Sequence, residues 1–271
     1  ARSGHRFKLD RALRENFWTD RSPTVATLFP LIAAENAEDR GIESLALDGN
    51  RPNNPNRTGN YAGCIWMQDC SRIAIRGVTA RNYNGDGISW QVCHDVTVER
   101  CHSHGHAGLG LHPGSGAQRA VIRENLLEDN DIGIFFCWGV KYGLAEKNTL
   151  RRNATGISIG HRDDENLVRD NDILDSGTVG VVFRPERGEG YTAQGNRVVN
   201  NRIVNSGGDD GVAVDLQGVT AGNVIAVNEL RETRAPAQRT GIRLGADTGE
   251  NEVRDNVIEG FATPLQDLRN Q

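Results

Sequence analysis

The stretch Thr155–Ser176 reads TGISIGHRDDENLVRDNDILDS and contains one glycine-led strand, one charged turn and two strands that each follow an asparagine. We call the glycine-led strand of each repeat the opening strand; here it is 156–160, GISIG. Opening strands recur as GISWQ at 87–91, GLGLH at 108–112, GIFFC at 133–137, GVVFR at 180–184, GVAVD at 211–215 and GIRLG at 241–245. Their glycines are 21, 25, 23, 24, 31 and 30 residues apart. A repeat of this period is typical of a solenoid.

Asparagines mark the later part of each repeat in two series. The first series is Asn166, Asn196, Asn223 and Asn251, and each member stands five residues before a member of the second series, which is Asn125, Asn148, Asn171, Asn201, Asn228 and Asn256. The flanking residues are apolar and β-branched at alternating spacing, which indicates strands. No leucine consensus is present, which argues against a leucine-rich repeat. We therefore predict an all-β fold, a single-stranded right-handed parallel β-helix (solenoid) of eight or nine coils with three short strands per coil and ladders of stacked asparagines.

The repeat leaves room for one repetitive domain. Residues 1–41 do not repeat cleanly and are expected to cap the N-terminal end of the solenoid, with a short helical turn in AAENAED at 33–39. Residues 42–271 are expected to form the β-helix domain, since each coil packs only on its neighbours. The loop 51–62 and the insertions 186–194 and 232–239 should project from the coils.

Charge and composition exclude several classes of partner. The net charge of −5 is spread along the chain without a basic block, which argues against nucleic acid and against an anionic membrane surface. No run of 18 apolar residues predicts a membrane span. No signal peptide is visible, so the location is open, with an extracellular or periplasmic location expected if the protein acts on a polymeric glycan. The oligomeric state is not indicated.

Five cysteines leave two interpretations of the closest pair. Cys70 and Cys93 fall at the same place in adjacent coils, where their Cα atoms should lie within disulfide range. They are either a disulfide or two stacked buried thiols, and the thiols are the favoured interpretation.

The outward face of the opening strands is the expected site of chemistry. Because strands alternate, positions two and four of each opening strand should point inward and positions three and five outward. Histidine can act as a base near neutral pH, arginine can bind a carboxylate, and tryptophan offers a flat face for a sugar ring. The candidate catalytic residues are His161, His112, Arg184, Asp86 and Asp163; the candidate substrate-binding residues are Trp138, Trp66, Gln91 and Asp215. His161 is expected to be exposed, stacked over Trp138, and His112 and Asp215 are assigned to position five.

A structural interpretation competes for the charged turns. Aligning the turns after position five pairs Lys141 with Asp164, Arg162 with Glu186, and Asp163 with Arg187. Such coil-to-coil pairs would simply stabilise the surface of a solenoid, and we favour this interpretation for Arg162, Asp163, Asp164 and Glu186.

Metal and phosphate binding have weaker support. HSHGH at 102–106 could place His102, His104 and His106 on one side of a strand, but the repeat puts them on the third strand and no carboxylate stands at a suitable spacing. We expect no metal or cofactor, and the sequence does not indicate calcium. The glycines at 105, 108 and 110 precede no helix, which argues against a phosphate site.

The repeat resembles the pectate-lyase-like superfamily of right-handed β-helix proteins, in its carbohydrate-active branch, over nearly the whole chain. That resemblance implies a substrate groove along the outward face of the opening strands. The run 84–87, NGDG, is similar to the Asn-Thr-Asp motif of polygalacturonases, but the paired aspartates of the next coil are absent, which argues against inverting hydrolysis. The calcium carboxylates of pectate lyases are not evident. The run 160–163, GHRD, is similar to the Asp-Pro-His-Asp element of alginate epimerases, but only the histidine and the final aspartate match.

Three functions are therefore considered. The first is a carbohydrate-active enzyme on an oligo- or polysaccharide, of the uronate-containing class, that abstracts a proton in lyase or epimerase chemistry. In it, His161 or His112 takes the C5 proton, Arg184 neutralises the carboxylate, and Trp138 and Trp66 hold sugar rings. The second is a glycoside hydrolase that uses Asp86 with Asp163 or Asp215. The third is a non-catalytic glycan-binding or structural β-helix.

Overall fold

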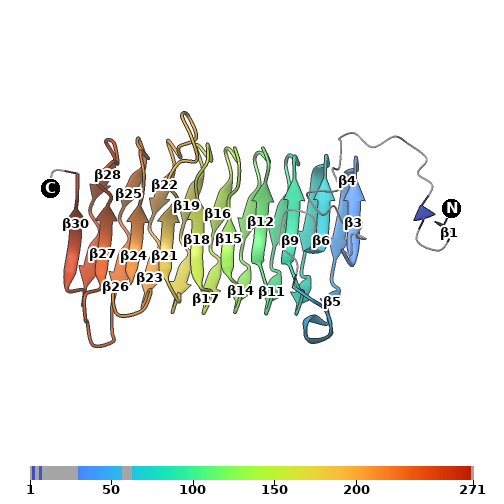
Figure 1. Cartoon of the computed structure of the whole chain (residues 1–271), viewed down its shortest axis with the longest axis horizontal. Coiled ribbons are helices and arrows are strands. Elements are labelled where there is room, and N and C mark those ends of the chain that lie inside the picture. Colours follow the sequence, from blue (N-terminus) through green and yellow to red (C-terminus); the bar gives the residue numbers. More distant parts are fainter. Residues whose placement is uncertain (1, 4–5, 8–29, 57–62, 270–271) are drawn as a thin grey trace.

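The computed structural model describes residues 2–3, 6–7, 30–56 and 63–269. It is an elongated stack of coils, with β3 near the N-terminal end and β30 at the C-terminal end (Figure 1). The chain runs through three parallel sheets in turn and then climbs to the next coil. The right-handed parallel β-helix predicted from the repeat is confirmed.

Three sheets form the sides of the coil. The opening sheet contains β3 (Ile32–Glu35), β6 (Gly63–Gln68), β9 (Asp86–Gln91), β12 (Leu109–Gly114), β15 (Ile132–Phe135), β18 (Thr155–Ile159), β21 (Val179–Phe183), β24 (Val212–Leu216), β27 (Thr240–Leu244) and β30 (Thr263–Asp267). The second sheet contains β4 (Glu38–Glu43), β7 (Ser71–Arg76), β10 (Thr97–Glu99), β13 (Val121–Arg123), β16 (Leu144–Glu146), β19 (Leu167–Arg169), β22 (Arg197–Val199), β25 (Val224–Ala226) and β28 (Glu252–Arg254). The third sheet contains β5 (Ala46–Asp48), β8 (Thr79–Arg81), β11 (His102–His104), β14 (Leu126–Glu128), β17 (Thr149–Arg151), β20 (Asp172–Leu174), β23 (Arg202–Val204), β26 (Glu229–Arg231) and β29 (Val257–Glu259).

Two short features lie outside these sheets. Strands β1 (Arg2–Ser3) and β2 (Arg6–Phe7) pair antiparallel, and a 3₁₀ turn, η2, spans Arg51–Asn53. No helix in the described parts of the chain has the length and apolar character needed to cross a membrane.

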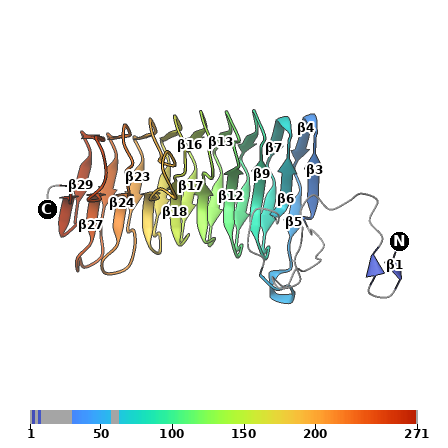
Figure 2. The same ribbon diagram turned by 45° about the horizontal axis from the view of Figure 1, so that its top comes forward.

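The core is a column of apolar side chains stacked from coil to coil. Each opening strand contributes two inward residues, and the largest of them, Trp90, Phe136 and Phe183, are fully buried. Because every coil meets similar side chains above and below, a narrow core can be continuous along the rod. Figure 2 shows the sheets turned, with each coil lying directly against its neighbours.

The predicted asparagine ladders are present at the corners between sheets. In the second series, Asn171 donates from Nδ2 to the Oδ1 of Asn201 at 2.9 Å, and its own Oδ1 accepts from Asn148. The residue before each asparagine of this second series makes a sharp corner; Asp170, for example, has φ of 55°. Left-handed backbone costs roughly 1 kcal/mol per non-glycine residue, so the ladder bonds offset the strain of the corners.

A third ladder occupies the corner that leads back to the opening sheet. Asn130 donates to the Oδ1 of Asn153 at 3.0 Å, and Ser176 and Ser206 are the buried residues at the following corners. The sequence analysis missed this series because serine replaces asparagine in its later members.

The first coil begins earlier than the expected boundary at residue 42. Strand β3 pairs with β6 in the opening sheet, and β4, which spans that boundary, pairs with β7 in the second sheet. The helical turn expected in 33–39 is wrong, because these residues form parts of both strands. At the other end, β30 pairs in parallel with β27 and completes the opening sheet. A cap was expected over residues 1–41, and most of that segment, residues 8–29, lies outside the described part of the chain.

The cysteines are buried free thiols, as the favoured interpretation held. Cys70 and Cys93 lie in adjacent coils, and the backbone N–H of Cys70 donates to the sulfur of Cys93 at 3.3 Å. Burial raises the pKa of the Cys93 thiol to about 12.

Candidate functional site

Two of the expected site residues sit two positions earlier in their strands than the sequence alignment placed them. His112 pairs in register with Ser89, and Asp215 pairs with Val182 and Arg243. Both therefore occupy position three instead of position five. Position three of the opening sheet reads Trp66, Ser89, His112, Phe135, Ser158, Val182, Asp215, Arg243 and Gln266 from coil to coil.

The corrected register brings Asp86 and His112 into direct contact. The Nδ1 of His112 lies 2.8 Å from the Oδ2 of Asp86, which is the first residue of the preceding opening strand. The other carboxylate oxygen, Oδ1, accepts the backbone N–H of Leu109 at 3.1 Å. Both side chains are buried, and the Nε2 of His112 has no hydrogen-bond partner among the described residues. An aspartate at Nδ1 favours the tautomer with its proton on Nδ1, which leaves a lone pair on Nε2.

Neighbouring residues hold this pair in place. Ser89 Oγ lies 3.4 Å from His112 Nδ1 and accepts a hydrogen bond from Gln91 Nε2 at 2.9 Å. Gly108 lies beside Asp86, and a Cβ there would stand 2.6 Å from Asp86 Oδ1, so only glycine leaves room for the carboxylate. Gln91, expected to bind substrate, is buried, with its Oε1 unpaired.

Arg184 lies across the outer face three coils beyond His112. Its guanidinium donates to Ser158 Oγ at 2.5 Å and to the carbonyl of Phe136 at 2.8 Å, and it lies 4.3 Å from the centroid of the Phe135 ring. The same ring meets the imidazole of His112 edge-on, with 5.4 Å between centroids. Phe135 thus lies between His112 and Arg184, two of the five candidate catalytic residues.

These contacts correct the role expected of Arg184. Both terminal nitrogens are already hydrogen-bonded, and only Nε lacks a partner, so a free two-pronged grip on a substrate carboxylate is not present. Gly160 makes this pose possible, because a Cβ there would lie 3.0 Å from the Cβ of Arg184. Burial lowers the pKa of Arg184, and the neighbouring Asp163 opposes that shift.

Asp163 is a buried corner residue. Its Oδ1 accepts the backbone N–H groups of Gly139 and Val140, each at 2.9 Å, and its Oδ2 accepts that of Gly160 at 2.9 Å and Arg184 Nη2 at 3.3 Å. Burial raises the pKa of Asp163 to about 7, while Arg184 and the three amide groups lower it. With all these donors directed at one carboxylate, Asp163 stabilises the turn from a buried position, and the surface pair with Arg187 that the structural interpretation expected is replaced by the contact with Arg184.

His161 is buried, and the expectation that it is exposed is wrong. Only 4% of the residue is accessible, because it packs under Trp138, with 5.3 Å between ring centroids. Burial lowers the pKa of His161 to about 4, with further contributions from Arg184 and Arg187. The stacking of His161 with Trp138 is confirmed. The exposure from which the role of base was inferred is therefore absent, and none of the ion pairs among the described residues places a carboxylate on this ring, as Asp86 is placed on His112.

The two candidate tryptophans differ in exposure. Trp138 is 37% exposed, which suits a sugar-stacking surface, whereas Trp66 is only 3% exposed and is wrongly placed as an open platform. Asp215 is also buried and receives two hydrogen bonds from Arg243, at 2.9 and 2.5 Å, and one from Gln217 at 2.6 Å.

One of the three expected charge pairs across the turns is present. Lys141 pairs with Asp164 at 2.8 Å. Glu186 instead accepts the backbone N–H of Val219, and Asp163 pairs with Arg184. Arg162 lies over the ring of Tyr191, at 4.4 Å from its centroid.

The histidine-rich segment 102–106 divides between surface and core. His102 pairs with Glu128 at 2.8 Å and stacks on His104, while His106 is buried and contacts the backbone of Tyr83 and Ala80. Within the described residues, no three His, Cys, Asp or Glu side chains are grouped to hold a metal ion.

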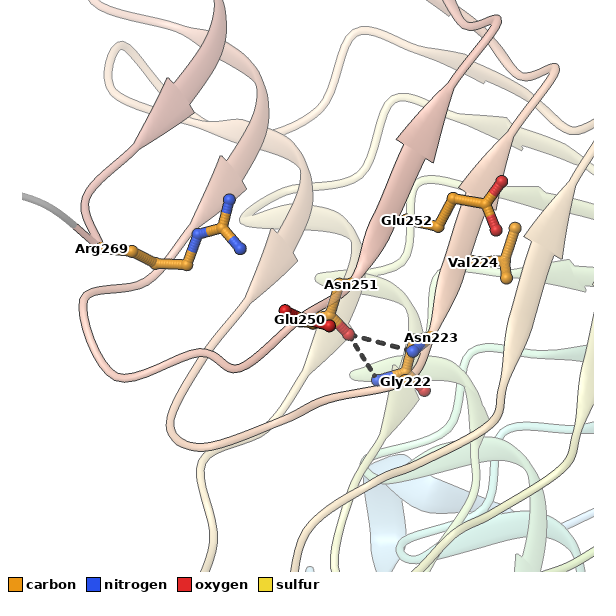
Figure 3. Close-up of a pocket in the computed structure, with 7 residues that line it drawn as sticks. All are labelled: Gly222, Asn223, Val224, Glu250, Asn251, Glu252 and Arg269. Carbon is orange, nitrogen blue, oxygen red and sulfur yellow. Dashed lines mark hydrogen bonds between the residues drawn. The ribbon is translucent and has the colours of Figure 1, made fainter.

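Cavities lie toward the C-terminal end of the rod. Two clefts of about 420 and 410 Å³ flank Arg243 on the outer face of the opening sheet, with Asp210 on the rim of both. Figure 3 shows another, of about 450 Å³, around the last members of the first ladder, where Asn251 Oδ1 accepts two hydrogen bonds from Asn223. This third cavity lies at a corner between sheets, away from the Asp86–His112 pair.

A family model described as the right-handed β-helix region matches residues 63–258, more than half of the chain. The chain belongs to this right-handed β-helix family. No curated protein matches it by sequence.

Solved structures with the same fold include several enzymes. The alginate lyase from Paenibacillus sp. str. FPU-7 matches with a TM-score of 0.61 and 11% identity, over 76% of this chain and 75% of that one. The Yersinia enterocolitica family 28 exopolygalacturonase matches at 0.55 and 13%, over 75% of this chain and 47% of its own. A periplasmic alginate epimerase matches at 0.53 and 11%, over 87% and 74%. At these identities the similarity shows the fold.

Proposed function

We propose that this protein is a carbohydrate-active enzyme that abstracts a proton from a uronate-containing polysaccharide, with His112 as the base and Asp86 as its partner. The observation that carries this proposal is the 2.8 Å contact between Asp86 and His112 Nδ1, together with the unpaired Nε2 on the opposite side of the ring. A base held by a carboxylate, with an unpaired nitrogen on the opposite side of the ring, is the arrangement that general base catalysis uses.

The chemistry follows from the tautomer. The lone pair of Nε2 takes the proton from C5 of a uronate, where the adjacent carboxylate stabilises the negative charge that develops. In elimination, the C4–O bond then breaks, the electrons of the C5–H bond form a C4–C5 double bond, and the leaving oxygen takes a proton. In epimerisation, a proton returns to C5 from the opposite face. In both cases Asp86 stabilises the imidazolium that forms on His112.

Arg184 supports this chemistry as a fixed positive charge. Its guanidinium and the imidazole of His112 contact the same Phe135 ring, so negative charge that develops beside His112 lies in the field of Arg184. The Nε–H of Arg184 is buried and has no partner among the described residues, so it can donate to a substrate oxygen only when this face opens. Asp163 holds the guanidinium in place by its contact with Nη2.

The burial of His112 sets a requirement on the mechanism. The residue is 1% exposed, so Nε2 must become accessible when a sugar binds. The Phe135 ring contacts the imidazole and is the described neighbour that must turn to admit a substrate.

The hydrolase alternative has less support from these contacts. Asp163 and Asp215 are buried and already accept hydrogen bonds from an arginine and other donors, so neither is a free second carboxylate for Asp86. The solved structures that share the fold include enzymes named for alginate and for polygalacturonan, which supports the choice of a uronate substrate.

The test is incubation with a panel of acidic polysaccharides, alginate and polygalacturonate among them. Ultraviolet absorbance detects the unsaturated product of elimination, and deuterium uptake at C5 from heavy water detects epimerisation. His112→Ala should reduce either activity by roughly 10²–10⁴-fold. His104→Ala, a change of the same kind on the third sheet, should retain it.

Three results would overturn the proposal. Full activity in His112→Ala would move the base elsewhere. New reducing ends without unsaturation or deuterium uptake would identify a hydrolase. Binding without any turnover across the panel would identify a glycan-binding protein.

A further inference from the structure

Two aromatic and two arginine side chains gather at the corner that follows the opening sheet. Trp138 lies after β15, Arg162 after β18, and Arg187 and Tyr191 in the insertion after β21, so three consecutive coils contribute. We call these four residues the aromatic–arginine rim.

The rim residues contact one another in a chain. The rings of Trp138 and Tyr191 meet edge to face, with 5.6 Å between centroids and an interplanar angle of 76°. The guanidinium carbon of Arg162 lies 4.4 Å from the Tyr191 centroid, and that of Arg187 lies 5.9 Å from the Trp138 centroid. Each cation is therefore placed beside an aromatic face within the range of cation–π attraction.

The two arginines are exposed and form no ion pair with any residue that the structure describes. Three carboxylates of the same turns are engaged elsewhere, whereas Glu165 is exposed. Asp164 pairs with Lys141, Asp163 pairs with Arg184, and Glu186 accepts the backbone N–H of Val219 on the next coil. Glu189, also in the insertion, is exposed and makes no described contact with the rim. The rim thus presents two guanidinium groups that no described carboxylate neutralises by an ion pair.

This combination selects a class of ligand. The exposed Trp138 surface can receive the apolar face of a sugar ring, and two guanidiniums can bind a carboxylate or sulfate by charge-assisted hydrogen bonds. A neutral glycan would use only the aromatic surface, and a simple anion would use only the arginines.

We propose that the aromatic–arginine rim is a binding subsite for an anionic sugar unit, displaced along the rod from the Asp86–His112 pair. The rim residues lie one to three coils beyond His112, which is roughly 5–15 Å along the axis. This inference rests on the proposed function for its polysaccharide substrate, and adds the position at which a second charged unit is held.

Binding is measured with His112→Ala protein, so that no turnover interferes. Isothermal titration uses short alginate and oligogalacturonate oligomers, with a neutral cello-oligomer of the same length for comparison. The acidic oligomers should bind more tightly than the neutral one, and the difference should shrink as salt is raised.

Variants of the rim give the decisive comparison. Trp138→Ala and the double change Arg162→Ala with Arg187→Ala should each weaken binding of the acidic oligomers by about tenfold or more, which is about 1.4 kcal/mol. Arg197→Ala, an exposed arginine on the second sheet, should leave the affinity unchanged.

Unchanged affinity in both rim variants, an equal loss in Arg197→Ala, or no binding of either acidic oligomer would overturn the subsite. The proposed function is tested separately by turnover. If His112→Ala keeps full activity while the rim variants lose affinity, the catalytic assignment fails and the subsite stands.

Discussion

Replacing one asparagine in the middle of the second ladder should lower the free energy of unfolding by an amount that follows from the hydrogen bonds it makes. Asn171 is buried, donates from Nδ2 to the carbonyl of Ala145 and to Asn201 Oδ1, each at 2.9 Å, and its Oδ1 accepts the backbone N–H of Asn148 at 3.0 Å. In Asn171→Ala the N–H of Asn148 and the carbonyl of Ala145 lose these partners inside the protein. At about 1–3 kcal/mol for each stranded group, the free energy of unfolding should fall by roughly 2–6 kcal/mol.

The end of the same ladder provides a matched control. Asn256 also donates to a carbonyl, that of Ile225 at 2.8 Å, and accepts from Asn228 at 3.0 Å. It is only partly buried, so water can replace its hydrogen bonds, and Asn256→Ala should lose less than Asn171→Ala.

Urea unfolding followed by circular dichroism measures both losses. Repeat proteins can unfold in parts, so the transition should first be checked with a second probe, the fluorescence of the tryptophans. Equal losses of unfolding free energy in the two variants, or a larger loss in Asn256→Ala, would refute the assignment of Asn171 to a buried position in the middle of the ladder.

Three further predictions concern titration and thiol chemistry. Burial lowers the pKa of His106 to about 3 and that of His161 to about 4, below the value near 6.5 expected when unfolded, so the unfolded chain binds more protons below pH 6.5. The free energy of unfolding should therefore fall as pH drops from 6.5 toward 4.5, by up to about 1.4 kcal/mol per pH unit for each histidine. Urea unfolding measures it, and a free energy that does not change with pH in this window would contradict the burial of both histidines. Arg123, Arg76 and Arg100 lower the pKa of buried Glu99 to about 2. Glu99→Gln should therefore destabilise the fold at pH 7, because it leaves those cations uncompensated, and the loss should vanish near pH 2. An unchanged melting temperature at pH 7 would exclude this. Burial raises the pKa of the Cys93 and Cys137 thiols to about 12, so a thiol reagent at pH 8 should modify them only after unfolding, whereas rapid modification of the native protein would show that they are accessible.

The fold could be predicted because its determinants are local and repeated. Most coils carry their own opening glycine, their own inward residues and their own corner asparagine, so one repeat such as 155–176 shows the pattern from which the fold is predicted. The third ladder was missed because serine takes over at Ser176 and Ser206, and the first coil because 32–43 lacks the glycine and asparagine markers.

The register of two coils could not be predicted in the same way. The segment 108–112 offers Gly108 and Gly110 as the first residue, and the structure aligns Gly110 with the other repeat glycines. In the coil of Asp215, Ala213 takes that place instead of Gly211. A shift of two residues keeps the alternation of the strand, so the hydrophobic pattern does not distinguish the two registers. The shift decides, however, whether His112 lies at the strand end or beside Asp86.

The exposure of side chains at the corners between sheets could not be predicted from the sequence either. Sequence alignment placed His161 and Trp138 over one another, but it could not show that the tryptophan covers the histidine and that Tyr191, from an insertion, packs on the tryptophan edge. The presence of a tyrosine and an arginine in the insertion 186–194 was the available signal for the aromatic–arginine rim.

The contact between a substrate carbon and His112 is the most direct test of the catalytic account. A crystal structure of Asp86→Asn protein with an acidic oligosaccharide keeps the shape of the site while slowing proton transfer. The account predicts that Phe135 has turned and that C5 of one sugar lies about 3–3.5 Å from His112 Nε2. An oligosaccharide bound with His112 still buried and no sugar carbon near Nε2 would contradict it.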